Sequence, residues 1–174
     1  MIEQPVDKND LPTQEEVIRE TEHFLERDVI HYHRISDTAY GISWMLYPVN
    51  SPQRREVAES LARYFHRETH LDFPPYTAGD ENDDRLVYLV RSMRITTAVP
   101  IIAGAVGLQR ASEEWVLTWI WLHPWERRTR LVDAVFDLLD AAFGDFFIEA
   151  PISGAMRGLM TKRHYESSRL VTRA

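Results

Sequence analysis

The sequence contains no cysteine among its 174 residues. A chain without thiols forms no disulfide and offers neither a thiolate metal site nor a cysteine nucleophile. Its apolar runs, such as Ile101–Leu108, are far shorter than the roughly 20 residues that span a bilayer. The N-terminus lacks a basic stretch followed by an apolar core, so we expect no secretory signal and a cytoplasmic location.

Several well-known catalytic motifs are also missing. The chain has 7 glycines, and they form neither a P-loop nor the glycine fingerprint of a dinucleotide site. No Ser-His-Asp arrangement is recognisable. His66 and His70 have the i, i+4 spacing of zinc ligands, but such pairs are common on helix surfaces, and we expect no metal site.

The net charge of −7 is distributed unevenly. Residues 1–90 contain 18 acidic and 9 basic side chains, whereas residues 91–174 contain 9 acidic and 11 basic ones. An acidic half joined to a slightly basic half argues against broad nucleic-acid binding. We therefore expect neither a nucleic-acid nor a membrane partner, and the second half leaves room for a local anion site.

Helical and strand-like periods alternate along the chain, which indicates one α/β domain over residues 13–174 behind a flexible arm over residues 1–12. A three-strand meander followed by helix, strand and helix predicts a mixed, mostly antiparallel twisted sheet with helices on both faces. The expected helices are Thr13–His31, Ser51–His70, Arg128–Phe143 and Ser153–Arg163, and the expected strands are Tyr40–Val49, Leu86–Met93, Pro100–Arg110, Trp115–Leu122 and Asp145–Ala150.

From residue 100 onward the sequence resembles the GNAT-type N-acetyltransferase family. Ile102–Leu108 is similar to the third strand of that family, which carries a glycine after an apolar start. Trp119–Pro124 is similar to the end of the fourth strand, and the arginine-containing turn and helix of Arg127–Phe143 follow it. Asp145–Ala150 and Ser153–Tyr165 resemble the fifth strand and the helix after it. The resemblance implies a GNAT-like fold that is shortened at its C-terminus.

The resemblance also implies acetyl transfer from acetyl-CoA to an amine, which attacks the thioester directly. In such a site the pyrophosphate meets unpaired amides at a helix start. The backbone of the fourth strand holds the pantetheine and polarises the thioester carbonyl. The implied cofactor-binding residues are Ile120, Trp121, Leu122, Arg127, Arg128, Thr129, Arg130, Leu131 and Ser153.

Two residues are the candidate catalytic groups. The family frequently places a carboxylate base on the fourth strand, and Glu114 at the start of that strand is the nearest one here. A tyrosine protonates the departing thiolate in many members, but that position falls on Met160, which has no proton to donate. Tyr165 is the candidate substitute for it.

The phosphate-binding turn departs from the family pattern. Arg127 matches its first position, but Arg130 and Val132 replace its two small residues. Glycine lets a phosphate approach the backbone, whereas an arginine either obstructs it or grips it by charge-assisted hydrogen bonds. The alternative function is a catalytically inactive protein-interaction or ligand-binding module of the same fold, with a homodimer or another protein partner.

Two further features bear on that choice. The tryptophans alternate along a strand, and we expect them on one face, in a core, a dimer contact or an acceptor pocket. They are Trp115, Trp119, Trp121 and Trp125. After Tyr165 the chain has room for one short strand, Arg169–Thr172, so either another chain completes the sheet or the pocket is open.

Overall fold

The computed structural model describes residues 44–79, 84–94, 100–123 and 126–172. The arm over residues 1–12, the expected helix Thr13–His31, residues 40–43 of the first expected strand and Trp125 lie outside these ranges. The described elements are β1 (Leu46–Pro48), α3 (Pro52–Thr69), β2 (Arg85–Arg91), β3 (Ile102–Ala111), β4 (Glu114–Leu122), α4 (Leu131–Phe143), β5 (Phe147–Ala150), α5 (Gly154–Lys162), the 3-10 turn Ser167–Arg169 and β6 (Leu170–Thr172).

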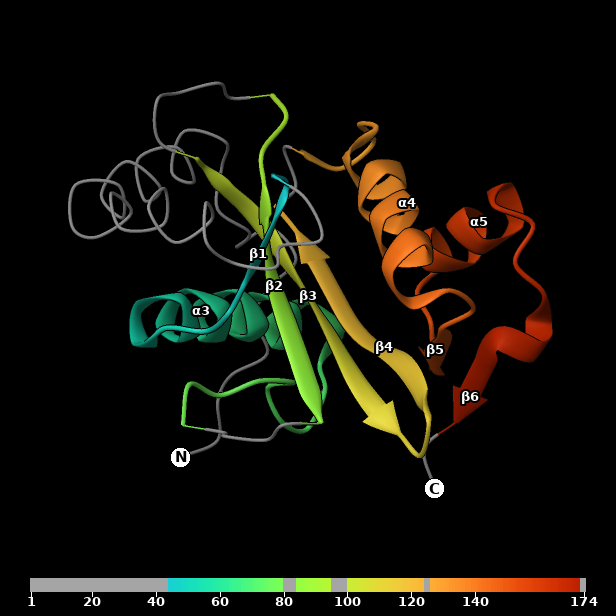
Figure 1. The fold of residues 1–174 in the computed structure, drawn as a ribbon, viewed down its shortest axis with the longest axis horizontal. Helices are drawn as coiled ribbons and strands as arrows, with labels where there is room; N and C mark the ends of the chain where they lie inside the picture. Colours follow the sequence, from blue (N-terminus) through green and yellow to red (C-terminus); the bar gives the residue numbers. More distant parts are fainter. Residues whose placement is uncertain (1–43, 80–83, 95–99, 124–125, 173–174) are drawn as a thin grey trace.

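The strands form one six-stranded sheet in the order β1-β2-β3-β4-β5-β6 (Figure 1). The pairs from β1 to β4 are antiparallel, and the pairs β4–β5 and β5–β6 are parallel. The sheet is therefore mixed and mostly antiparallel, as the sequence predicts, and its topology is consistent with a GNAT-like fold. β6 supplies the single short strand expected near the C-terminus.

Helices cover both faces of this sheet. On one face α3 packs on β2, β3 and β4 through a core that includes Ala58, Leu61 and Trp119. On the other face α4 and α5 lie side by side over a second core that includes Phe136 and Leu159 (Figure 1). Burial of each large apolar side chain contributes about 1.5–3 kcal/mol, so these two cores fix the helices to the sheet. In the described ranges, no helix is long and apolar enough to cross a membrane.

Capping groups set the ends of α3 at the expected positions. The Ser51 side chain accepts a hydrogen bond from the Arg54 amide, and Pro52 occupies the first turn, where an amide has no helical partner. His70 ends the helix in the left-handed conformation, with φ of 53°. Its amide donates to the His66 carbonyl and closes the last turn.

The next helix starts later than the sequence predicts. The pattern predicts a start at Arg128, but α4 begins at Leu131. The reason is the backbone of Arg128, whose φ of 63° is incompatible with a right-handed helix. Arg130 is the N-cap, and its side chain makes no capping hydrogen bond. Thr129, one residue earlier, accepts the Leu131 N–H through its Oγ1 at 3.1 Å. Gly144 ends α4, as expected.

A β-bulge interrupts the pairing of β3 with β4. Leu108 pairs with Leu117, whereas Gly107 pairs with Trp119, so Thr118 is an extra residue in β4. The Thr118 hydroxyl donates to the Gly107 carbonyl at 3.2 Å and holds the bulge in place. An extra residue reverses the faces to which the following side chains point.

The bulge places the tryptophans on two faces, so the expectation of one shared face was wrong. Trp115, which precedes the bulge, packs on the α4 side, where its ring centroid lies 5.5 Å from that of Phe143. Trp119 and Trp121, which follow it, are buried on the α3 side. An alternation rule that ignores bulges could not have separated them.

Beyond the bulge, β4 and β5 separate. The two parallel strands pair at Val116 with Phe147 and at Leu117 with Ile148, and no further pair joins them over the described residues. β4 nevertheless continues to Leu122. The sheet therefore opens between β4 and β5 toward the ends from which α4 and α5 begin.

Candidate functional site

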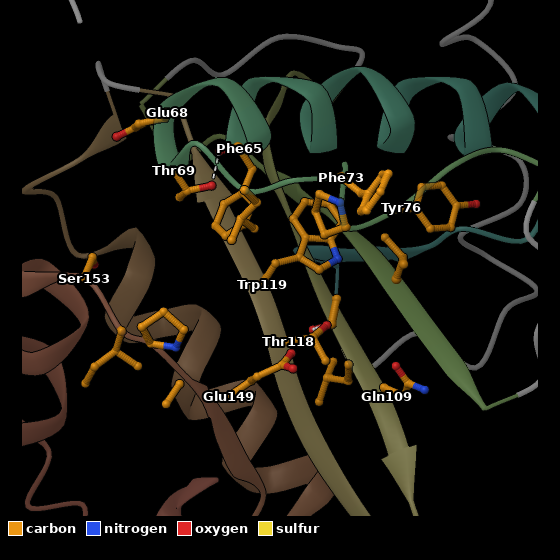
Figure 2. Close-up of a pocket in the computed structure, with 18 of the residues that line it drawn as sticks. Phe65, Glu68, Thr69, Phe73, Tyr76, Gln109, Thr118, Trp119, Glu149 and Ser153 are labelled. Atoms are coloured by element: carbon orange, nitrogen blue, oxygen red, sulfur yellow. Dashed lines mark hydrogen bonds between the residues drawn. The ribbon is translucent and has the colours of Figure 1, made fainter. Parts of the chain in front are cut away.

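A cleft of about 620 Å³ lies on the α3 side of this opening. Three parts of the chain form it: the end of α3 with the loop over residues 71–76, the middle of strands β2 to β4, and the junction of β5 with α5. Figure 2 shows Trp119 near its centre, Glu149 reaching from β5 toward Thr118, and Ser153 on the same side as Glu149. The cleft thus joins the bulge of β4 to the end of β5.

Trp119 forms the floor of the cleft and is 3 % exposed. Its indole lies on Gly107, where a Cβ atom would stand 2.0 Å from the indole nitrogen. Phe65 of α3 packs against it from above, with ring centroids 6.0 Å apart. Glycine at position 107 is therefore required for the indole to lie flat in this place.

Ser153 is the one expected cofactor-binding residue that lines the cleft. It is the N-cap of α5, and its Oγ accepts the Met156 N–H at 3.1 Å. Its hydroxyl therefore stabilises the start of α5. The junction between β5 and α5, whose last residue is Ser153, lines the cleft.

The backbone of Ile120–Leu122 adjoins the opening between β4 and β5. The His123 amide donates to the Ala103 carbonyl on β3. Because successive residues of a strand direct their backbone groups to opposite sides, Ile120 and Leu122 direct theirs toward β5. The Leu122 carbonyl is already engaged, since it accepts a hydrogen bond from Arg127 Nε at 2.9 Å.

The side chain of Arg127 is committed to α3. Its two terminal nitrogens each lie 2.5 Å from a carboxylate oxygen of Glu68. Trp121 Nε1 donates a hydrogen bond to the same carboxylate at 2.8 Å. The indole ring of Trp121 also stacks on the ring of Tyr64, with ring centroids 5.1 Å apart. These contacts lock α3 to the turn between β4 and α4, so the structure does not present Arg127 as an open phosphate ligand.

A buried carboxylate occupies the core of that turn. Glu126 is 1 % exposed and accepts hydrogen bonds from the Ser92 hydroxyl and, at 3.3 Å, from the Arg94 amide. Its carbonyl accepts the Thr129 hydroxyl at 2.6 Å. Asp133 adds a second carboxylate in the first turn of α4, where it pairs with Lys162 at 2.6 Å. Negative charges of the chain itself therefore complement the positive end of α4.

Two expected phosphate ligands remain exposed at this turn. Arg128 and Arg130 are both exposed to solvent. Neither makes an ion pair with another residue of the described ranges. Thr129 and Leu131, in contrast, are hydrogen-bonded to each other at the start of the helix. A ligand phosphate would meet guanidinium groups here rather than an open row of amides.

The structure places Tyr165 on the opposite face of the sheet from the cleft. Its ring belongs to the α4-side core, and its hydroxyl donates to Asp140 Oδ2 at 2.5 Å. Arg169 lies over the ring, 4.1 Å from its centroid. Burial and, next, the Asp140 carboxylate raise the pKa of Tyr165 to about 12. This arrangement is a structural lock between the C-terminal segment and α4.

Glu114 is also remote from the cleft. It pairs with Ala111 beside the β3–β4 turn and is exposed. Four residues of extended strand, roughly 13 Å, separate it from the bulge. The described carboxylate that does reach the cleft from the sheet is Glu149 of β5.

Sequence reasoning missed Glu149 and Glu68. Glu149 alternates with the buried Ile148 on a short strand, and nothing in its neighbours distinguishes it from a solvent-facing residue. Glu68 lies 59 positions from Arg127, and only the packing of α3 brings the two together. Within the described ranges, no group of three or more His, Asp or Glu side chains is arranged to hold a metal ion.

Solved structures, rather than known sequences, resemble this chain. No family model matches the sequence, and no curated protein matches it significantly. Among solved structures, the chain is similar to an aminoglycoside acetyltransferase from an uncultured soil metagenomic sample, solved in complex with trehalose. The match has a TM-score of 0.41 and 14 % sequence identity, and it covers 73 % of this chain and 91 % of that one. The likeness is one of the fold alone.

Proposed function

We propose that the protein transfers an acyl group from acyl-CoA to an amine in the cleft beside the β4–β5 opening. The observation that carries the proposal is the opening between β4 and β5. The two strands pair at only two positions of β4, Val116 and Leu117, and they diverge from the bulge at Thr118 onward. A cleft of about 620 Å³ lies at the point where they diverge. Diverging strands leave backbone amides and carbonyls available to an extended ligand that carries peptide-like groups. Pantetheine has two such amides.

Glu149 is the carboxylate best placed to act as the general base. It lines the cleft from β5, next to the opening, whereas Glu114 lies at the far end of β4. An amine must lose a proton before or during attack on a thioester, and a carboxylate takes that proton directly or through one water molecule. The remainder of the rate enhancement then comes from holding the amine against the thioester carbon.

Arg128 and Arg130 supply the phosphate contacts in this proposal. Both guanidinium groups are exposed at the start of α4, and arginine binds phosphate oxygens through paired, charge-assisted hydrogen bonds. Their side chains take over the role that an open row of backbone amides has at a glycine-rich turn. Acetyl-CoA is the acyl donor that we expect.

The second candidate function is a non-catalytic binding module, and Glu126 favours it. Its buried carboxylate lies in the turn that precedes α4 and opposes the approach of a pyrophosphate by charge. In that case the cleft binds a small molecule without acyl transfer, as a single chain or as a homodimer.

Calorimetric titration with acetyl-CoA and with free CoA distinguishes these candidates. We expect micromolar binding of both and release of free CoA when an amine is added. Because the protein has no cysteine, a thiol reagent detects the released CoA without background from the protein. Glu149→Gln should lower the rate at least tenfold and leave CoA affinity unchanged. Absence of CoA binding to cooperatively folded protein would leave the binding module as the function.

A further inference from the structure

Exposed apolar side chains gather at the mouth of the cleft. In the ranges that the structure describes, four large apolar side chains are exposed, and two of them, Leu71 and Phe73, line the cleft. Phe73 is 79 % exposed and Leu71 is 40 % exposed. The exposed Pro151 and the half-buried Ile152 line the same cleft from the junction of β5 with α5. These four residues form an apolar rim, which is a usual feature of a ligand-binding cleft.

The loop that carries Phe73 is held in place by its neighbours. Tyr76 is 6 % exposed and packs in the α3-side core. The Ala78 amide donates a hydrogen bond to Glu59 Oε2 of α3 at 2.8 Å. Pro74-Pro75 restricts the backbone between these anchors and Phe73, because each proline ring fixes its own φ. The apolar rim is therefore preformed before any ligand binds.

The size of the rim fits a small molecule rather than a protein partner. A large aromatic side chain buries roughly 150–250 Å² in full, so Leu71 and Phe73 together expose a few hundred Å² at most. A stable protein interface buries about 800 Å² on each partner. The cleft volume of about 620 Å³ lies within the range of small-molecule sites.

The rim discriminates between ligands by desolvation. An apolar group placed against Leu71 and Phe73 removes apolar surface from water on both sides of the contact. A hydroxyl or ammonium group in the same place loses its water and gains no hydrogen-bond partner from these side chains. Asp72 also lines the cleft, but it is exposed, and water screens its attraction for a cation. The rim therefore favours an apolar body over a polyol or a polyamine.

We infer that the acceptor is an amine with an apolar body, which lies against the rim while its nitrogen points toward the β4–β5 opening. The inference rests on the proposed acyl transfer and names its substrate class. Figure 2 shows Phe73 on the α3 side of the cleft and Thr118, the bulge residue at the opening, nearer to β5, so one ligand can contact both ends.

The reaction with such an acceptor balances without a further reactant. The lone pair of the neutral amine attacks the thioester carbon, and a carbon–nitrogen bond forms as the carbon–sulfur bond breaks. The nitrogen gives one proton to the general base. The thiolate leaves with the electron pair and takes one proton from solvent, so the products are an amide and free CoA.

Three amines of equal size test the inference without CoA. n-Hexylamine ends in a methyl group, 5-amino-1-pentanol has a hydroxyl there, and 1,5-diaminopentane has a second ammonium. Ligand-observed NMR and calorimetry on the full chain measure their affinities. We expect n-hexylamine to bind about tenfold more tightly than either of the others, because only its end group gains from contact with the rim.

Variants of Phe73 locate the contact. Phe73→Ser should weaken n-hexylamine about fivefold and leave 5-amino-1-pentanol unchanged, whereas Phe73→Leu keeps an apolar side chain and should retain most of the preference. Met93→Ser is the matched control and should change nothing, because Met93 is an exposed apolar residue that does not line the cleft. Circular dichroism and thermal melting establish that each variant is folded before its affinity is interpreted.

The outcomes separate this inference from the proposed function. Selective binding of n-hexylamine without acyl transfer supports the ligand class and rejects the enzyme. Acyl transfer to 5-amino-1-pentanol as fast as to n-hexylamine supports the enzyme and overturns the ligand class. No binding of n-hexylamine, equal binding of the three amines, or tighter binding of 1,5-diaminopentane also overturns it. A wild-type dimer in sedimentation that Phe73→Ser dissociates would assign the rim to a second copy of the chain instead.

Discussion

Gly107 on β3 lies directly against the indole of Trp119 on β4, so close that a Cβ atom at position 107 would stand 2.0 Å from the indole nitrogen. The contact fixes the position of the Trp119 indole, because Phe65 of α3 packs against the same ring from the other side of the cleft floor. It also explains a glycine in the middle of a buried strand, where this residue is otherwise unfavourable. The shape of the cleft therefore depends on the absence of a side chain on the neighbouring strand.

Gly107→Ala should destabilise the protein by about 1–3 kcal/mol, because the indole must shift into Phe65 or the strands must part. Urea unfolding followed by far-UV circular dichroism measures this change. The double variant Gly107→Ala with Trp119→Phe should recover part of the lost free energy of unfolding, because the smaller phenyl ring no longer clashes with the added methyl group. Gly158→Ala is the control: it lies in α5 with no atom near its added methyl, and it should stabilise by about 0.5–1 kcal/mol. An unchanged free energy of unfolding for Gly107→Ala would contradict the close packing.

The pair of Glu68 and Arg127 should be a real contributor to stability. A double-mutant cycle with Glu68→Gln and Arg127→Gln should give a coupling free energy of about 1–2 kcal/mol, because the pair is bidentate and partly buried. The pair of Glu59 and Arg63 on the same helix is the comparison. It has one short contact, and its arginine is 66 % exposed, so about 0.3–0.5 kcal/mol is expected. Equal coupling free energies for the two pairs would show that the Glu68–Arg127 pair, which joins α3 to the β4–α4 turn, contributes no more to stability than an exposed ion pair.

Tyr165→Phe should leave acyl transfer unchanged. Its hydroxyl lies in the α4-side core and is bound to Asp140 and Arg163, so its loss removes a structural hydrogen bond and costs about 1 kcal/mol. Initial rates of CoA release and thermal melting, measured side by side, check both halves of this expectation. A drop in kcat of tenfold or more without a change in KM would assign the hydroxyl to catalysis after all.

His123 should make the fold sensitive to acid. Burial and, next, the charge of Arg127 lower the pKa of His123 to about 3 from its ordinary 6.5. In the unfolded chain the His123 imidazole becomes protonated below about pH 6.5, whereas in the folded chain it stays neutral until about pH 3. The free energy of unfolding therefore decreases progressively as the pH falls through this window. His123→Gln should reduce the fall of the urea midpoint between neutral pH and pH 4. His66→Gln on α3 is the control, and an equal effect from it would reject the assignment.

Arg128 and Arg130 should carry the phosphate contacts of the acyl donor. Replacement of both by serine should weaken CoA by about tenfold or more and should flatten the dependence of affinity on salt, because two charge-assisted contacts are lost. Arg127→Ala combined with Arg130→Ala should also weaken CoA, through the loss of Arg130, and should in addition lower the melting temperature, because Arg127 no longer pairs with Glu68. Calorimetry at two salt concentrations distinguishes these effects. Undiminished affinity of the double serine variant would remove both residues from the site.

The sequence by itself determined the order of the elements within the described ranges and the class of the sheet. Capping chemistry at Ser51 and Pro52, the glycine at the end of α4 and the alternation within each strand depend on neighbouring residues, so they can be read without the fold. The meander from β2 to β4 and the short final strand follow from the same local patterns.

Only the tertiary structure decided which residues meet at the cleft. The bulge at Thr118 reverses the face of every later side chain in β4, and no local pattern announces that extra residue. The partner of Arg127 lies on a distant helix, so its commitment to Glu68 is invisible in the sequence. Tyr165 and Glu114 have suitable chemistry but lie elsewhere, whereas Glu149 reaches the cleft because β5 ends beside the opening. Local propensities set each element, and long-range packing sets which side chains face one another.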